Sequence, residues 1–141
     1  MIEAALRAIL LADATVAGLV GTRVYTGTMP QRATFPLVTL KKVDKISDLT
    51  LADAVGPNTL RVQVDCWAQD GAGTAGADNV RALADAVNGS DDQSSRGPLH
   101  GYKGTSAGQR INLLRLLIER STEYESETQL YRVSADYAAH L

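Results

Sequence analysis

The chain has 141 residues, of which 45% are hydrophobic and only 5% aromatic, and its formal net charge is −2. A chain of this length forms one domain with a sizeable core and needs no metal or cofactor to fold. The charge disfavours a general nucleic-acid binder, which carries a basic surplus. The single cysteine, Cys66, excludes an internal disulfide, and no apolar run approaches the roughly 20 residues of a membrane span.

The N-terminal segment has the pattern of an amphipathic helix. Apolar residues recur at helical spacing over 2–12, so they form one stripe on a helix surface. Asp13 or Thr15 is suited to cap a second helical turn, and Gly21 is suited to end it. We therefore expect two consecutive helical segments before the first strand.

The next segments indicate strands separated by a long loop. β-Branched residues predict a brief strand over 23–25 and a longer one over 37–43. Residues 44–58 end in a Gly-Pro-Asn turn signal, and we expect them to form a long surface excursion, a type of loop that is often functional.

The clearest strand runs from residue 60 to 68, because apolar and polar residues alternate along it. One face is predicted to join the core, and the other to meet water or a neighbouring molecule. Exposed tryptophan is a common interface anchor, although packing of Trp67 beneath a loop is an equal alternative. The predicted core face carries Leu60, Val62, Val64, Cys66 and Ala68, and the polar face carries Arg61, Gln63, Asp65 and Trp67.

A glycine-rich turn follows, with the G-x-G-x-x-G spacing of a dinucleotide-binding site at Gly71, Gly73 and Gly76. A dinucleotide site needs a buried parallel strand before this turn, whereas an alternating strand is typical of an antiparallel sheet. We therefore interpret the glycines as a connector, with Asp70 or Thr74 capping the next helix. A small dinucleotide-binding enzyme remains the alternative from a different functional class.

The C-terminal half is predicted to contain one helix and two strands. Helical spacing covers 77–87, and residues 89–110 lack periodicity, so we expect a long surface loop there. Residues 111–120 and 129–139 predict two antiparallel strands joined by a polar hairpin loop. The order of elements favours a single α+β domain over 1–141, with a mainly antiparallel sheet of about four strands and two helices packed on one face.

The remaining polar residues predict no catalytic, cofactor or metal site. Ser106 lies in a G-x-S-x-G string, but that string leads into a strand, whereas a nucleophile elbow leads into a helix. Two histidines 40 residues apart and one cysteine do not supply a zinc site. An acidic group, Glu119, Glu123, Glu125 and Glu127, is interpreted as a solvated hairpin tip, with a patch for a basic neighbour as the alternative.

Five stretches taken together resemble the tail-completion and tail-terminator proteins of long-tailed bacteriophages and of phage-like gene-transfer particles. They cover nearly the whole chain in the same order, and none is diagnostic by itself. An extra stretch near 90–98 departs from the usual pattern. The stretches are IEAALRAILLADATVAGLVGTRVY, RVQVDCWA, VRALADAV, GYKGT and ESETQLYRVSADY.

The resemblance implies a structural virion protein and not an enzyme. It implies a ring, expected to be a hexamer, that caps the tail tube, ends tail elongation and joins the tail to the head, assembling in the host cytoplasm. The implied partners are other copies of the chain, the tail tube protein and a neck or head-completion protein, while DNA passes through the lumen without being read. A neck adaptor ring is the alternative within the same biology.

Two groups of residues are candidates for these contacts. We expect the polar face of the central strand and the 44–58 excursion to contact neighbouring copies or the tube. The 89–110 loop is expected to lie at an axial junction and to become ordered when a partner docks. The candidates are Arg61, Gln63, Asp65, Trp67, Asp48, Leu49 and Leu51 for the first surface, and Tyr102 and Lys103 for the axial loop.

Overall fold

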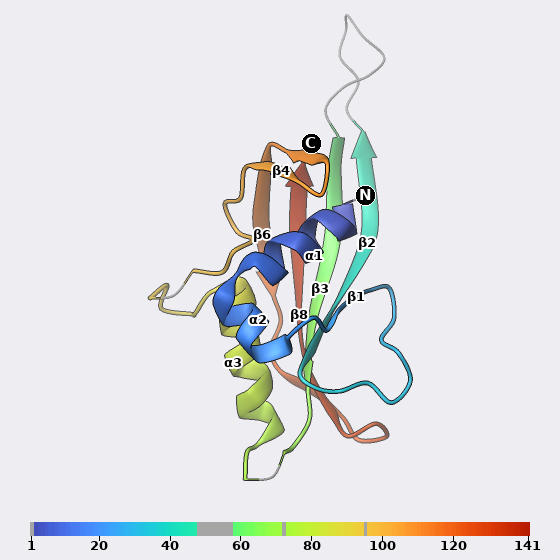
Figure 1. The fold of residues 1–141 in the computed structure, drawn as a ribbon, viewed down its shortest axis with the longest axis vertical. Coiled ribbons are helices and arrows are strands. Elements are labelled where there is room, and N and C mark those ends of the chain that lie inside the picture. The colour runs from blue at the N-terminus through green and yellow to red at the C-terminus, as the bar shows by residue number, and fades with distance from the viewer. Residues whose placement is uncertain (1, 48–57, 72, 95) are drawn as a thin grey trace, which may run out of the picture.

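The computed structural model describes residues 2–47, 58–71, 73–94 and 96–141. Three helices lie on one face of a twisted sheet whose other face carries no helix within these residues (Figure 1). The helices are α1 (Ile2–Ala12), α2 (Ala14–Val20) and α3 (Gly76–Asn88). The sheet strands are β1 (Val24–Thr26), β2 (Leu37–Ser47), β3 (Asn58–Ala68), β6 (Leu113–Glu119), β7 (Glu123–Glu125) and β8 (Leu130–His140), and β4 (Gly104–Ser106) pairs with β5 (Gln109–Ile111) as a separate hairpin.

The main sheet has the order β1-β2-β3-β8-β6, with β7 also pairing to β8. All of these pairs are antiparallel except β1 with β2, which is parallel. The mainly antiparallel α+β fold is therefore confirmed. The expected counts of about four strands and two helices are too low within the described residues, which form six strands of the main sheet and three helices. β1 matches the brief strand predicted over 23–25, whereas β7 was missed because its three residues are too few to show alternation in a sequence.

The start of the fold follows the predicted capping signals. The Asp13 carboxylate accepts hydrogen bonds from the backbone N–H groups of Thr15 and Val16, at 3.1 and 3.0 Å. It thereby satisfies N–H groups that have no partner inside α2. Gly21 ends α2 with a φ of 61°, a conformation that glycine adopts at little cost.

The core lies between the helices and the sheet. The central strand β3 alternates as predicted, with Val62, Val64 and Cys66 fully buried. From the helix side, Leu6, Leu10 and other buried apolar residues pack against them. Burial raises the pKa of the Cys66 thiol well above its ordinary range, so this cysteine is a small apolar core residue.

Two predicted loops contain more regular structure than expected. The excursion expected over 44–58 begins later, because β2 continues to Ser47 and β3 starts at Asn58. The polar residues Asp44 and Lys45 gave no apolar alternation, yet their backbone pairs with β3 beyond a bulge. Within 89–110, β4 and β5 form a hairpin, and Leu99 is fully buried.

None of the helices in the described ranges has the length and apolar character needed to cross a lipid bilayer. In the same part of the chain, no group of three or more histidine, cysteine or acidic side chains is placed to hold a metal ion.

Candidate assembly surface

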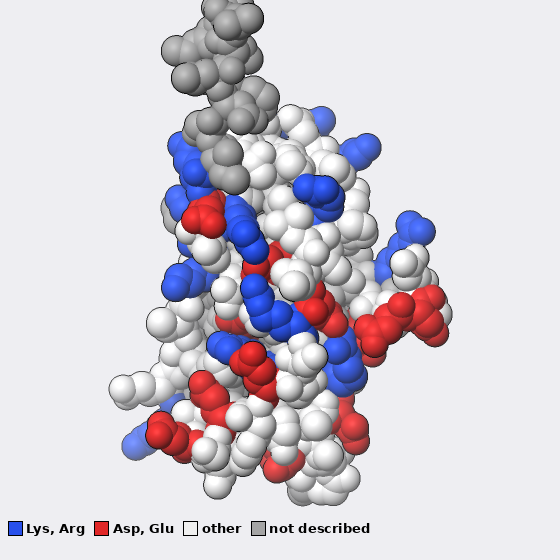
Figure 2. Space-filling model, turned by 180° about the vertical axis from the view of Figure 1, so that it is seen from behind, with Lys and Arg blue, Asp and Glu red and all other residues white. Residues whose placement is uncertain are grey.

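The uncovered face of the sheet carries the polar residues that the sequence assigned to it. Arg61, Gln63, Asp65 and Trp67 all project from β3 on the side away from the helices, and each is partly exposed. Figure 2 shows this face, where basic and acidic side chains lie next to one another across the middle of the sheet. The charges are paired by specific contacts across neighbouring strands.

A carboxylate held by two arginines is the centre of this face. Asp136 on β8 has a side chain only 5% exposed, and it contacts Arg61 at 2.7 Å and Arg120 at 3.0 Å. The hydrogen bond from Arg120 lowers the pKa of Asp136, with Arg61 adding to the effect against the opposing cost of burial. Arg61 lies on β3 and Arg120 directly follows β6, the two strands that flank β8, so the ion pairs tie these three neighbouring strands together.

Trp67 is fixed in place on the same face, next to the last residue of β3. Its indole Nε1 donates a hydrogen bond of 3.0 Å to Thr39 Oγ1 on β2. The guanidinium of Arg132 lies 5.4 Å from the centre of the ring, close enough for a cation–π contact, and pairs with Glu123 at 2.6 Å. Trp67 is thus half-buried among side chains from adjacent strands and keeps an exposed portion of its ring.

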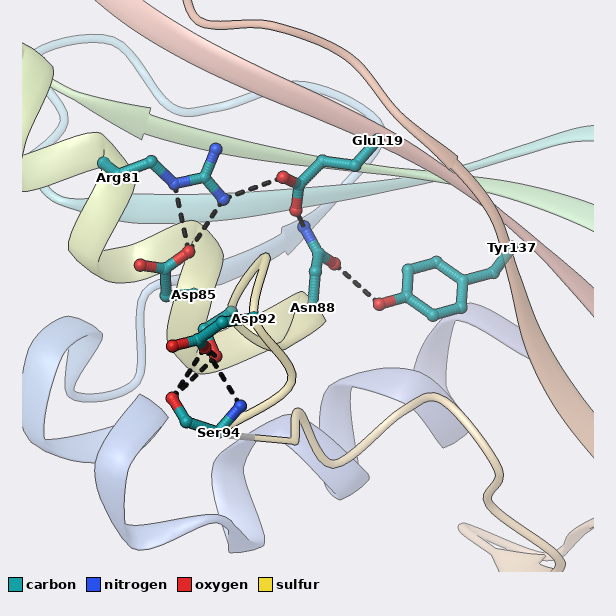
Figure 3. Close-up of polar contacts among 8 residues, drawn as sticks. Arg81, Asp85, Asn88, Asp92, Ser94, Glu119 and Tyr137 are labelled. Atoms are coloured by element: carbon teal, nitrogen blue, oxygen red, sulfur yellow. Dashed lines mark hydrogen bonds and ion pairs between the residues drawn. The ribbon is translucent and has the colours of Figure 1, made fainter.

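A second polar chain lies on the helix side and joins α3 to the sheet (Figure 3). The Tyr137 hydroxyl donates to Asn88 Oδ1 at 2.6 Å, and Asn88 Nδ2 donates to Glu119 at 2.8 Å. Glu119 also pairs with Arg81 at 2.7 Å. The acidic group proposed from the sequence is therefore divided, because Glu119 faces α3 while Glu123 and Glu125 are exposed on β7.

The two enzyme-like motifs have structural roles. The strand before the glycine turn is antiparallel to both of its neighbours, as the connector interpretation requires. The N-cap of α3 is Ala75, so neither Asp70 nor Thr74 holds the predicted N-cap position, but the Asp70 carboxylate accepts a hydrogen bond of 2.6 Å from the N–H of Gly76, the first residue of the helix. Ser106 lies in β4 and donates to the carbonyl of Ala5 at 2.8 Å, which fastens the β4–β5 hairpin to α1.

The remaining candidates lie apart from the uncovered face. Tyr102 is half-buried and Lys103 is exposed, and the backbone of Tyr102 pairs with Leu114 at the outer edge of β6. Asp48, Leu49 and Leu51 lie outside the described residues.

The sequence reasoning missed that Arg120 and Asp136 belong to the same site as Arg61. Alternation did place Asp136 on the polar face of its strand. The missing information was the order of the strands, because Arg61 and Asp136 are 75 positions apart. The sequence shows only an acid on the polar side of an alternating strand, and it is the burial seen in the structure that requires a partner arginine.

The sequence and the fold can be compared with those of known proteins. Residues 4–141 match the model of the family described as "Tail completion protein gp17". A chain in a solved structure, the virion of a native gene transfer agent particle, shares the fold with a TM-score of 0.74 and 21% identity, over 99% of this chain and 92% of that one. The sequence has no significant match among curated proteins. Because the family match spans nearly the whole chain, this protein belongs to the gp17 tail completion family, whose members are structural bacteriophage tail proteins.

Proposed function

We propose that copies of this chain form a ring, expected to be a hexamer, that caps the head-proximal end of the tail tube and joins it to the head. The observation that carries the proposal is the family match over residues 4–141. The fold agrees with such a role, since it offers separate surfaces for neighbours: an uncovered sheet face, and the outer edge of β2 beyond Leu40, which no described strand covers. A cyclic ring needs two different contact surfaces on each subunit.

Within this ring, the uncovered face contacts the tail tube or neighbouring copies. Its side chains are held in place by ion pairs and by the Trp67–Thr39 hydrogen bond, so few rotamers have to be frozen when a partner docks. Tyr102 and Lys103 are proposed to lie at an axial junction with a partner. DNA passes through the lumen without sequence-specific contacts, and the protein resides in the virion after assembly in the host cytoplasm.

Removing the protein tests the proposal and distinguishes a ring that ends tail elongation from a neck adaptor ring. In cells that make the particle without this chain, we expect unjoined heads together with tubes that exceed their normal length, because nothing ends polymerisation. Electron microscopy of the lysate measures both. Unjoined tubes of normal length would instead indicate a neck adaptor, and intact joined particles would contradict both functions.

Replacing Trp67 by alanine tests the uncovered face. We expect soluble, folded protein with a loss of joined particles of roughly tenfold or more, because an interface anchor of this kind typically contributes about 2 kcal/mol or more. Plaque or transfer titre measures the loss. Tyr124→Ala is the control, because Tyr124 on β7 pairs with Tyr131, whose ring packs toward Gly76 of α3, away from the uncovered face. Normal titre together with an unchanged oligomer would remove this face from the interface.

A further inference from the structure

The outer edge of β2 is uncovered beyond Leu40. The short strand β1 pairs with β2 only along Val38–Leu40, and the N–H of Gly27 then donates to the Leu40 carbonyl at 2.8 Å. Gly27 has a φ of 82°, and there the chain leaves the edge. No described strand pairs with the outer side of β2 beyond this point (Figure 1). The inner side stays paired with β3 as far as Ser47, so the open segment keeps an extended backbone.

Basic side chains line this open segment. We call Lys41, Lys42, Val43, Asp44 and Lys45 the lysine edge, and all of them are exposed. Three lysines stand here against one aspartate, in a chain whose net charge is −2. Every ion pair among the described residues uses an arginine, so none of these lysines has an acidic partner there. The lysine edge therefore carries a surplus of positive charge that no ion pair neutralises.

The lysines project to both sides of the sheet. Lys42 and Lys45 pair across β3 with the core residues Val62 and Leu60. Residues directly opposite each other share a face of a sheet, so these two lysines lie on the helix side. Lys41 precedes Lys42 in the strand and lies on the other side. A further strand laid along this edge would therefore meet ammonium groups on both of its faces.

Val43 gives the lysine edge one apolar side chain. It is the extra residue of a β-bulge between Lys42 and Asp44, and it is 46% exposed. Bulges and lysines on an edge strand hinder pairing with a strand of the same kind. A strand with acidic side chains reverses the effect of the lysines, and Val43 offers it an apolar contact.

The chemistry of the open backbone favours a protein strand over a nucleic acid. An unpaired strand edge presents N–H donors and C=O acceptors in turn. A phosphate backbone accepts hydrogen bonds and so satisfies only the N–H groups. A polypeptide strand satisfies both, as in strand addition to exposed sheet edges. Asp44, in the middle of the lysine edge, also repels phosphate.

We propose that the lysine edge binds an extended acidic segment of another virion protein, which adds to the sheet as a strand beside β2. The backbone of this segment pairs with β2, its carboxylates lie opposite the lysines, and an apolar side chain contacts Val43. Opposite charges on neighbouring strands stabilise such a pair. The binding requires only that the chain is a virion protein, and it does not require the ring proposed above.

A peptide titration of the full chain tests the pairing in solution. The probe is the acetylated and amidated peptide Thr-Glu-Val-Glu-Val-Glu-Thr, and the backbone amide signals of the protein are followed by NMR. We expect the signals of residues 41–45 to shift, and the binding to weaken as the salt concentration rises from about 50 to about 500 mM. The same peptide with lysine at each glutamate position should shift none of these signals.

Two comparisons distinguish strand addition from simple charge attraction. The variant Lys42→Glu with Lys45→Glu should bind the probe at least about tenfold more weakly. Lys103→Glu with Arg110→Glu reverses two exposed cations outside the lysine edge and should bind like the wild type. A probe with an N-methylated backbone keeps its carboxylates and cannot donate backbone hydrogen bonds, so it should also bind at least about tenfold more weakly. Equal binding of the N-methylated probe, or no shift at 41–45, would contradict the proposal.

Photo-crosslinking in purified particles identifies the partner. A benzophenone amino acid is placed at Val43, and mass spectrometry maps the peptide joined to it; the same group at the exposed Asp78 of α3 is the control. We expect a product with an acidic segment of a different virion protein from position 43 and not from position 78.

The other outcomes of the cross-linking count against this binding. A product with DNA or with another copy of the chain would overturn it. The absence of a product would do the same if immunoblotting finds the chain in the particles. Absence of the chain itself from the particles would overturn its role in the virion and this binding together.

Discussion

Replacing Gly97 by alanine is expected to lower the free energy of unfolding by about 2–3 kcal/mol, as overpacking of a tight site does. A Cβ at this position would overlap the backbone carbonyl of Val87 in the last turn of α3. Backbone atoms cannot rotate away as a side chain does, so α3 or the 89–97 segment must shift. Urea unfolding followed by circular dichroism measures the loss.

Gly18→Ala is the matched control, because Gly18 lies within α2 and no neighbouring atom comes within 4 Å of the position that an alanine methyl group would take. There the change should raise stability by about 0.5–1 kcal/mol, since alanine favours the helix. A Gly97→Ala protein as stable as the wild type would show that the close approach of the two segments is not required for folding.

Replacing Asp136 by asparagine is expected to lower the free energy of unfolding by about 1–3 kcal/mol at neutral pH, because the change removes charge-assisted hydrogen bonds. Those bonds come from Arg61 and Arg120, and their loss leaves two cations facing a neutral group. The value lies below that of a fully buried pair, because the arginine side chains are 42% and 40% exposed.

The same carboxylate gives a stability that depends on pH. The folded-state pKa of Asp136 is lower than its value in the unfolded chain, so its contribution is present above the unfolded value of about 3.9 and is lost as the pH falls through the folded value. The stability difference between wild type and Asp136→Asn should therefore shrink as the pH falls below about 5. Glu127→Gln, which removes an exposed carboxylate, should show no such trend.

Sequence patterns predicted the parts of the fold that depend on interactions between residues close in sequence. The apolar stripe of residues 2–12, the capping of α2 by Asp13, and the alternation from 60 to 68 each involve neighbours in sequence, and the structure confirms all three. They also sufficed to place Arg61, Gln63, Asp65 and Trp67 on the polar side of β3.

These patterns could not predict the features that depend on the order of the strands in the sheet. Asp136 meets Arg61 only because β8 inserts between β3 and β6. The extension of β2 through Asp44 and Lys45 depends on pairing with β3, since its own residues are polar. The hairpin of β4 and β5 is too short for periodicity, and the Ser106 contact fastens it to α1.

The brevity of β1 has a consequence for how free molecules meet in solution. An uncovered strand normally invites a second identical strand to pair with it, which starts fibre growth. Here such a symmetric encounter would bring six ammonium groups, from Lys41, Lys42 and Lys45 of each molecule, into one narrow strip. The repulsion between these groups disfavours pairing with the same strand of another molecule. It leaves the strand available to a surface of opposite charge.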